Sequence, residues 1–298
     1  MKYWYPRHVR SSEERLRYYA DHFDTVEVDS TYYRLPELQM VERWAERTPP
    51  GFVMHVKAFG MMTRHPVKLQ ALPPELREGA PVDERGRVDR PSRELRTEVF
   101  ARFHEALEPL RSAGKLGGIL LQFPSYIVCK PRSFEYLEWA TEQLRGDEPL
   151  VEFRHRSWLE EDNRHEVLAF LERLGATHVI VDAPKTEAKN LVPTVAALTS
   201  GTAYVRFHGR NAGTWNVRGK SAAERFNYLY DEAELGEWAG TLGELAGAAE
   251  NAYAFFNNNG RSAAAGADGE GADAWVAQAA TNAIMLRQLL RQAEVPVS

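Results

Sequence analysis

Residues 149–155 read PLVEFRH, an apolar run that becomes charged at Glu152, Arg154 and His155. The run is short and rich in β-forming residues, which predicts a buried strand. Six further stretches share this character and are bounded by Gly, Pro or Asn: TVEVDSTYY from Thr25, FVMHVKAF from Phe52, LGGILLQFP from Leu116, THVIVDAP from Thr177, TAYVRFHGR from Thr202 and NAYAFFNNN from Asn251. We therefore predict seven strands.

The segments between these strands carry apolar residues at three- and four-residue spacing, which predicts amphipathic helices. Clear examples are SFEYLEWATEQLR (133–145), RHEVLAFLERLG (164–175) and LGEWAGTLGELAGAA (235–249). Alternating strands and helices imply a parallel sheet. Because no linker separates the units, the pattern favours one α/β domain over residues 1–298, a closed TIM-type (β/α)8 barrel. A doubly wound sheet is the alternative, but its usual G-x-G-x-x-G turn is absent from the sequence.

Two stretches interrupt the alternation. Residues 60–93 form a long excursion rich in Pro, Glu and Arg. A structureless loop of this length is usually a lid, a binding loop or a mobile insert. Residues 260–273, GRSAAAGADGEGAD, are small and acidic, which is typical of a flexible insert.

The composition excludes several classes of protein. The 298 residues are 44% hydrophobic, which suffices for one large core or two modest ones. The net charge of -5 and the pI of about 6.0 argue against broad nucleic-acid binding, although a local basic pocket stays open. The single cysteine, Cys129, rules out an internal disulfide and a cysteine-rich metal site. No signal peptide or membrane-spanning run is recognisable, so we expect a cytoplasmic protein.

Polar residues concentrate in the second half of the predicted strands, where a buried parallel strand should be apolar. In chain order they are Glu27, Asp29, His55, Lys57, Gln122, Glu152, Arg154, His155, Asp182, Arg206, His208, Arg210, Asn257, Asn258 and Asn259. Residues two apart share a face, so inward-facing sets would converge on the C-terminal mouth of the barrel, where barrel enzymes place their chemistry. Individual charges can instead form structural ion pairs, such as Glu152 with Arg154 or Glu27 with Lys57.

These charges suggest an enzyme that acts on a small anionic substrate carrying phosphate or carboxylate. The anion-binding candidates are the basic strand-end residues Lys57, Arg154, Arg206 and Arg210, because guanidinium groups bind oxyanions bidentately. The candidates for proton transfer are His208, whose side-chain type titrates near neutrality, and the acidic residues Glu27, Glu152 and Asp182.

Six polar or aromatic residues near the strand ends are further substrate-binding candidates: Gln122, Asn257, Asn258, Tyr32, His65 and Trp158. For His65 the alternative is a loop residue that caps the turn before Pro66. For Trp158 the alternative is packing against the start of the next helix. Alternation allows only one of Tyr32 and Tyr33 to face the mouth.

Three other functions stay open. The acidic residues and His208 could bind a divalent metal in a hydrolase or isomerase, but no H-E-x-x-H motif marks a metal site and the nearby cations would oppose one. The sequence requires no cofactor. Arginines and aromatic residues permit nucleic-acid or nucleotide handling, which the net charge disfavours. A non-catalytic binding module is the third, and no membrane partner is expected.

The segments FDTVEVDSTYYRLP, FVMHVKAFGMMTRHP, LGGILLQFP, VEFRHRSW, YVRFHGR and FFNNN occur in an order and spacing that resemble the YecE-like proteins, domain of unknown function family 72. The resemblance extends from about Tyr5 to Leu290, and VEFRH and RFHGR are its most specific parts. It implies a TIM-type barrel and no established reaction.

The chain departs from this family at three places. Members usually begin with a strand carrying a Gly-Thr-x-Gly-Trp-type segment before a Tyr-Pro, whereas this chain begins at Trp4-Tyr5-Pro6. We therefore expect the first barrel strand to be missing or truncated, in agreement with the count of seven. The family tends to have Asn at the position of Asp29, and the insert after Gly260 is longer than the resemblance implies.

The HGR segment allows a specific geometric prediction. Strand alternation places Arg206, His208 and Arg210 on one face, so we expect Arg206 and His208 to point into the mouth and Arg210 to lie at its rim. Gly209 would let the backbone turn there. The alternative is a structural ion pair between Arg206 and Glu152.

Overall fold

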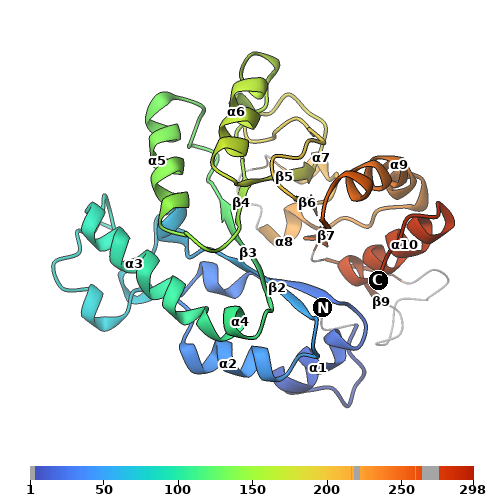
Figure 1. Ribbon diagram of the computed structural model, residues 1–298, viewed down its shortest axis with the longest axis horizontal. Coiled ribbons are helices and arrows are strands. Elements are labelled where there is room, and N and C mark those ends of the chain that lie inside the picture. The colour runs from blue at the N-terminus through green and yellow to red at the C-terminus, as the bar shows by residue number, and fades with distance from the viewer. Residues whose placement is uncertain (1–3, 216, 218–221, 259, 264–274) are drawn as a thin grey trace. The chain divides into compact units, whose positions relative to one another are not determined.

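The computed structural model describes residues 4–215, 217, 222–258, 260–263 and 275–298. The chain folds into two compact units (Figure 1). The N-terminal unit comprises residues 12–154 and 173–176, and the C-terminal unit comprises residues 1–11, 155–172 and 177–298.

The N-terminal unit contains a parallel sheet. Its strands pair in chain order: β1 (Thr25–Val28), β2 (Val53–Lys57), β3 (Leu116–Gln122) and β4 (Pro149–Glu152). Its helices are α1 (Ser12–Ala20), α2 (Leu38–Glu46), α3 (Arg93–Ala106), α4 (Glu108–Ser112) and α5 (Pro131–Glu142), with short 3-10 helices η1 (Ser30–Tyr32), η2 (Gly60–Thr63), η3 (Leu69–Ala71) and η4 (Pro74–Leu76). Because the strands are parallel, their carboxyl ends lie at one edge of this sheet.

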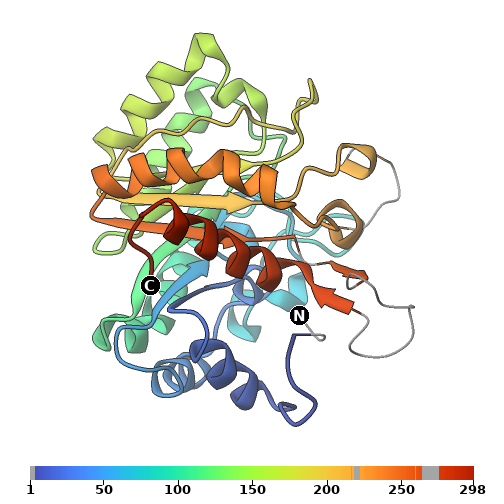
Figure 2. The same cartoon turned by 90° about the vertical axis from the view of Figure 1, so that its right-hand side faces the viewer.

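The C-terminal unit contains a second set of parallel strands. They are β5 (Thr177–Asp182), β6 (Thr202–Phe207) and β7 (Asn251–Phe256), and a short antiparallel pair is formed by β8 (Arg261–Ala263) and β9 (Trp275–Ala277). Its helical elements are η5 (Arg156–Trp158), α6 (Glu161–Arg173), α7 (Ala212–Trp215), α8 (Ala222–Arg225), α9 (Glu232–Ala248) and α10 (Gln278–Gln292). Figures 1 and 2 show α9 and α10 side by side next to β7.

The sheet of the N-terminal unit has two chemically different faces. One face is apolar and buried, with Met54 and Val56 on β2, Ile119 and Leu121 on β3, and Val151 on β4. Alternation turns the intervening residues to the opposite face, and these are the residues that become polar toward the strand ends. The sequence therefore builds one packing face and one polar face into the same strands.

The core of the C-terminal unit lies between its strands and the helices α9 and α10. Ile180, Val205 and Phe207 pack there with Trp238 and Leu286. A capping box begins α9: the Asp231 carboxylate accepts from the Glu234 backbone N–H, and the Glu234 carboxylate accepts from the Asp231 N–H. The apolar cluster around Ile180, Val205 and Phe207 fixes which face of β5 and β6 is covered by helices.

The excursion at residues 60–93 carries local structure of its own. It contains η2, η3 and η4, and its backbone closes on itself where the Val88 N–H donates to the Val67 carbonyl oxygen at 2.8 Å. Val67, Leu72 and Val88 are buried. A segment predicted as a long structureless loop is thus held by short helical turns and its own small apolar cluster.

All seven predicted strands are present among the described residues, and they alternate with helices. The α/β class is confirmed, and the fold is of the TIM-barrel type with one strand fewer. Most of the predicted insert at 260–273 lies outside the described residues, apart from residues 260–263. None of the helices in the described part of the chain has the length and apolar character needed to cross a membrane.

Candidate functional site

The carboxyl ends of β1–β4 gather polar side chains on one face of the N-terminal sheet. Glu27 lies opposite His55, and Gln122 lies opposite Glu152, in the strand register. Lys57 is two residues beyond His55 and shares its face. We call the set Glu27, Tyr32, Lys57, His65, Gln122, Glu152 and Arg154 the strand-end cluster. Seven of the candidates named in the sequence analysis thus lie at the carboxyl ends of these strands or in the segments that follow them.

Glu152 is fully buried, and two neighbours fix its carboxylate. Gln122 Nε2 donates to Glu152 Oε1 at 2.8 Å, and Arg154 Nη1 donates to the same oxygen at 3.1 Å. The structural ion pair considered for Glu152 and Arg154 is therefore present. Because these donors stabilise the charged carboxylate, Glu152 acts here as an anchor for the Arg154 side chain.

Lys57 lies between an acid and an aromatic ring. Its Nζ is 3.3 Å from Asp29 Oδ1 and 5.1 Å from the centroid of the Tyr32 ring. Asp29 thus supplies the carboxylate for this lysine, at a position where the family that the sequence resembles tends to have asparagine. At this distance Lys57 pairs with Asp29 and not with Glu27, the partner considered in the sequence analysis. Tyr33 is 73% exposed, so Tyr32 is the tyrosine that joins the cluster.

His65 packs edge-on against Tyr32, with 5.1 Å between ring centroids, and its Nδ1 lies 2.8 Å from Thr63 Oγ1. Burial, and after it the positive charges of Lys57 and Arg154, lower the pKa of His65 to about 4. The imidazole is therefore neutral at pH 7 and oriented by Thr63. It is held close to two cations.

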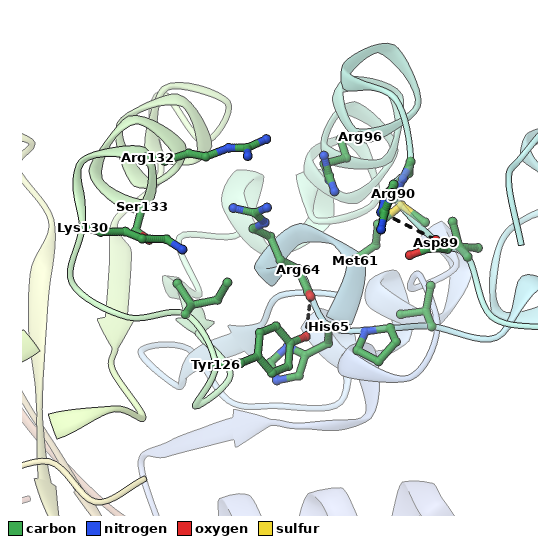
Figure 3. Close-up of a pocket in the computed structure, with 15 residues that line it drawn as sticks. Met61, Arg64, His65, Asp89, Arg90, Arg96, Tyr126, Lys130, Arg132 and Ser133 are labelled. Carbon is green, nitrogen blue, oxygen red and sulfur yellow. Dashed lines mark hydrogen bonds and ion pairs between the residues drawn. The ribbon is translucent and has the colours of Figure 1, made fainter. Parts of the chain in front are cut away.

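A second feature of the N-terminal unit is a cavity of about 460 Å³ beyond the strand ends, which we call the loop pocket. Its walls come from the 60–93 excursion, the start of α3, the β3–α5 connection and the start of α5. His65 lines it as well. Figure 3 shows Arg64, Arg96, Lys130 and Arg132 entering it from these different segments.

In the C-terminal unit, Arg210 does not lie on the face where alternation placed it, and it pairs with Asp182. Arg210 Nη2 donates to Asp182 Oδ2 at 2.8 Å, and the Asp182 carboxylate also accepts from Tyr230 Oη (2.7 Å) and Trp238 Nε1 (2.9 Å). Trp238 belongs to α9, so both residues face the helices. The prediction that Arg210 shares a face with Arg206 and His208 is wrong.

The cause of this difference is Gly209. Its φ of 86° lies in the left-handed region, and its N–H donates to Tyr230 Oη at 2.8 Å. The strand pleat ends there, so Arg210 turns to the helix side. Hydrogen bonding to Asp182 raises the pKa of Arg210, and burial together with the Asp182 charge raises the pKa of Tyr230.

Arg206 and His208 are both fully buried. Phe207 between them packs in the helix-covered core, so alternation places Arg206 and His208 on the opposite face, as expected. Asn257 Nδ2 lies 3.2 Å from His208 Nδ1. Their roles in catalysis and binding stay predictions.

Asn258 and Trp158 are built into the packing of the C-terminal unit. Asn258 Nδ2 donates to the Tyr228 carbonyl oxygen at 2.8 Å and to Asn282 Oδ1 at 2.7 Å, which joins the end of β7 to α10. Trp158 is fully buried in η5, just before α6. This position is that of the packing alternative rather than of an accessible wall for a ligand. Asn259 lies outside the described residues.

Within the ranges that the structure describes, no group of three or more His, Cys, Asp or Glu side chains is arranged to hold a metal ion. The residues that the sequence analysis missed are Arg64, Arg96, Lys130 and Arg132 of the loop pocket. They sit in loops and first helical turns, where no periodic pattern selects them. The one available signal was the density of arginine in the 60–93 excursion.

A family model described as "Protein of unknown function DUF72" matches residues 1–295. Among curated proteins, the chain is 34% identical over 254 residues to UPF0759 protein YunF of Bacillus subtilis, covering 84% of this chain and 82% of that one. It is 28% identical over 228 residues to UPF0759 protein YecE of Escherichia coli K12, covering 71% and 73%.

Two solved structures are similar in fold. A DUF72 family protein from Thermotoga maritima has a TM-score of 0.71 at 31% identity, covering 98% of this chain and 94% of that one. A DUF72 family protein from Enterococcus faecalis has a TM-score of 0.75 at 24% identity, covering 95% and 89%. The second supports the fold alone.

Proposed function

Since the chain belongs to the DUF72 family, whose description states no reaction, we propose its function from the site: an enzyme that moves a proton on a small anionic substrate at the carboxyl ends of β1–β4. The observation that carries the proposal is a neutral, half-buried histidine that Thr63 orients beside Lys57 and Arg154, at this edge of a parallel sheet. TIM-type enzymes place their reacting groups at this edge.

Lys57 and Arg154 bind the anionic group of the substrate. Both retain partly exposed side chains, 13% and 19% of their surface respectively, and both are already oriented, Lys57 by Asp29 and Arg154 by Glu152. A pre-oriented cation loses little side-chain entropy when it binds an oxyanion. The buried Glu152 is a positioning residue in this scheme, and Gln122 holds it in place.

His65 accepts the proton. In the free protein its pKa of about 4 makes it a weak base. A bound anion beside Lys57 and Arg154 offsets their positive charge, so the pKa of His65 rises toward neutrality when substrate binds. A general base is most effective when its pKa lies near the working pH. Substrate binding therefore switches on the base, and the empty site stays unreactive.

The other residues named in the sequence analysis have secondary roles in the proposal or none. Glu27 shares the cluster and is a second acid–base candidate, while His208, Arg206 and Asn257 belong to the C-terminal unit and stay candidates there. Asp182 and Arg210 are left out because they satisfy each other on the helix side. No observation favours the metal-dependent or nucleic-acid-binding alternatives, and the net charge of -5 opposes the latter.

Turnover in a defined mixture tests the proposal. Purified protein is incubated with pooled phosphate esters and carboxylic acids, and their depletion is followed by mass spectrometry. We expect depletion of at least one anionic compound, loss of at least about 100-fold in rate for His65→Gln, as for removal of a general base, and a comparable loss for Lys57→Met. Arg17→Gln, on α1 in an exposed ion pair, is the control.

Two outcomes would contradict this function. One is that the wild-type protein depletes no anionic compound in the pool. The other is that Lys57→Met and His65→Gln, shown to be folded by circular dichroism, turn over the same compound at the wild-type rate.

A further inference from the structure

Four cations of the loop pocket differ from three other arginines of the N-terminal unit, which are paired with acids. Arg87, Arg102 and Arg111 each make an ion pair of 2.7 Å or less with a carboxylate. Within the described part of the chain, no carboxylate pairs with Arg64, Arg96, Lys130 or Arg132, and the Nε of Arg96 is buried without a hydrogen-bond partner. Asp89 is the one acidic residue that lines the pocket, and its neighbour Arg90 is 3.9 Å from it.

The positively charged groups of these residues lie close together and repel one another. Figure 3 shows the charged ends of Arg64, Arg96 and Arg132 directed toward the same space. The Arg64 and Arg96 guanidinium groups lie 5.0 and 5.7 Å from the centroid of one ring, that of Tyr136. Burial lowers the pKa of Arg96, and the like charges of Arg64 and Arg93 lower it further. The positive charge gathered in this space is of the kind that a bound anion would balance.

Backbone strain is stored at the same place. Among the described residues, three that are not glycine have a positive φ, and two of them are the pocket arginines Arg64 (φ 65°) and Arg90 (φ 45°). Such conformations persist where the surrounding structure enforces them, and they concentrate at ligand-binding sites. The Tyr126 hydroxyl holds the first of them by donating to the Arg64 carbonyl oxygen at 2.7 Å.

Apart from His65, Asp89 and Ser133, the rest of the pocket lining is mostly apolar. Met61, Val67, Val88 and Ile127 line it and are buried, and the ring of Tyr126, 57% exposed, stands at its edge. A volume of about 460 Å³ is within the range of pockets for whole organic ligands and exceeds what a bare inorganic anion fills. Several cations on one side suit a group with two negative charges and three terminal oxygens.

We propose that the loop pocket binds an organic phosphate monoester, with its phosphate held by Arg64, Arg96, Lys130 and Arg132 and its apolar or aromatic part against Tyr126 and Ile127. The start of α5 at Pro131 adds the partial positive charge of a helix N-terminus to the phosphate end. Since His65 also lines this pocket, the ligand reaches the strand-end cluster. This phosphate site is separate from Lys57 and Arg154, which hold the anion of the substrate in the proposed function, so phosphate-ester binding here does not rest on that function.

Calorimetric titration of the full chain tests the site. The probes are phenyl phosphate, AMP, adenosine, inorganic phosphate and a single-stranded oligonucleotide. We expect one-to-one binding of phenyl phosphate or AMP, with adenosine and inorganic phosphate each at least tenfold weaker, because each lacks one half of the ligand. Failure of both phosphate monoesters to bind overturns the inference. Tighter binding of a single-stranded oligonucleotide, with a steep salt dependence, overturns it in favour of nucleic acid.

Matched variants assign the binding to this pocket. Arg96→Gln and Arg132→Gln should each weaken phosphate-ester binding at least tenfold, whereas Arg17→Gln should leave it unchanged. Arg64→Gly should also weaken binding and yet keep or raise the melting temperature, because glycine relieves the left-handed backbone. Unchanged affinity in these variants refutes the site.

A further variant separates this site from the proposed reaction. Lys57→Met, which lies outside the pocket lining, should abolish turnover and retain phosphate-ester binding. Loss of binding in Lys57→Met, with binding intact in Arg96→Gln, would move the phosphate to the strand-end cluster and overturn the pocket assignment.

Discussion

Asp182 is the residue on which the packing of the C-terminal unit depends most visibly. Its buried carboxylate accepts hydrogen bonds from Arg210, Tyr230 and Trp238. We expect Asp182→Asn to lower the free energy of unfolding by about 3–5 kcal/mol, because Arg210 loses its buried counter-charge. Urea denaturation monitored by circular dichroism measures the loss.

The double variant Asp182→Asn/Arg210→Met is the control for this prediction. Removing both partners leaves no buried uncompensated charge, because Glu237, the other carboxylate that accepts a hydrogen bond from Arg210, is exposed, so the double variant should be less destabilising than Asp182→Asn alone. A loss below about 1 kcal/mol for Asp182→Asn would instead be typical of an exposed ion pair and would argue against the buried arrangement.

Helix α9 contains glycines where a larger side chain would fit, Gly236 and Gly240 among them. A Cβ added at Gly236 or Gly240 would meet no atom within 4 Å. Each Gly→Ala change should therefore stabilise the protein by about 0.5–1 kcal/mol, because alanine loses less backbone entropy in a helix. Thermal and urea unfolding of the two single variants and the double variant measure the gain.

Gly117 in β3 provides the contrast within a strand. Its Cβ would lie 2.4 Å from Val53 Cγ1 and 2.5 Å from His55 Cε1 on β2, so Gly117→Ala should destabilise by about 1–3 kcal/mol through overpacking. Equal effects of the helix and strand substitutions would show that local crowding does not govern these positions.

Strands were the predictable elements of this chain. Each of the seven combines β-forming residues with glycine, proline or asparagine at its ends, and a run such as THVIVD carries that signal without help from the rest of the molecule. Alternation then predicted the polar face of β2, β3 and β4 correctly. It failed at Arg210, because the preceding glycine has a positive φ. The two-residue alternation of side chains assumes extended backbone and does not predict such a residue.

The loop pocket could not be predicted at the scale of the whole molecule. Arg64, Arg96 and Arg132 are separated by more than thirty residues each along the chain, and they meet because a loop and two helix starts converge. Propensity and periodicity describe neighbours in sequence, whereas this pocket is made by neighbours in space. His65 was found only because it follows a strand end closely.

Two buried histidines, His55 and His178, and the half-buried His65 predict how the stability of the molecule depends on pH. Burial lowers the pKa of His55 to about 3, and of His65 and His178 to about 4, from an ordinary value of 6.5. Between pH 6.5 and 4 the unfolded chain therefore binds protons that the folded chain does not. Stability is fully present above pH 6.5 and falls as the pH decreases toward 4.

Urea unfolding at pH 7.0 and 4.5 checks this direction. His178→Gln should reduce the difference between the two values, because glutamine does not titrate and its amide can still donate to the Val195 carbonyl oxygen, which His178 Nε2 reaches at 3.1 Å. Equal stability at both pH values in the wild-type protein would contradict the burial of neutral imidazoles.

Gly209 also shapes how the protein can diverge among lineages. Its left-handed backbone, and the 2.6 Å between an added Cβ and Tyr228 Cβ, leave glycine as the residue that fits. Because the pleat ends there, His208 and Arg210 contact different surroundings although only Gly209 lies between them in the sequence. Drift can therefore exchange the Asp182–Arg210 pair for an apolar pair while His208 stays under its own selection. One glycine thus lets two adjacent parts of the chain be substituted independently of each other.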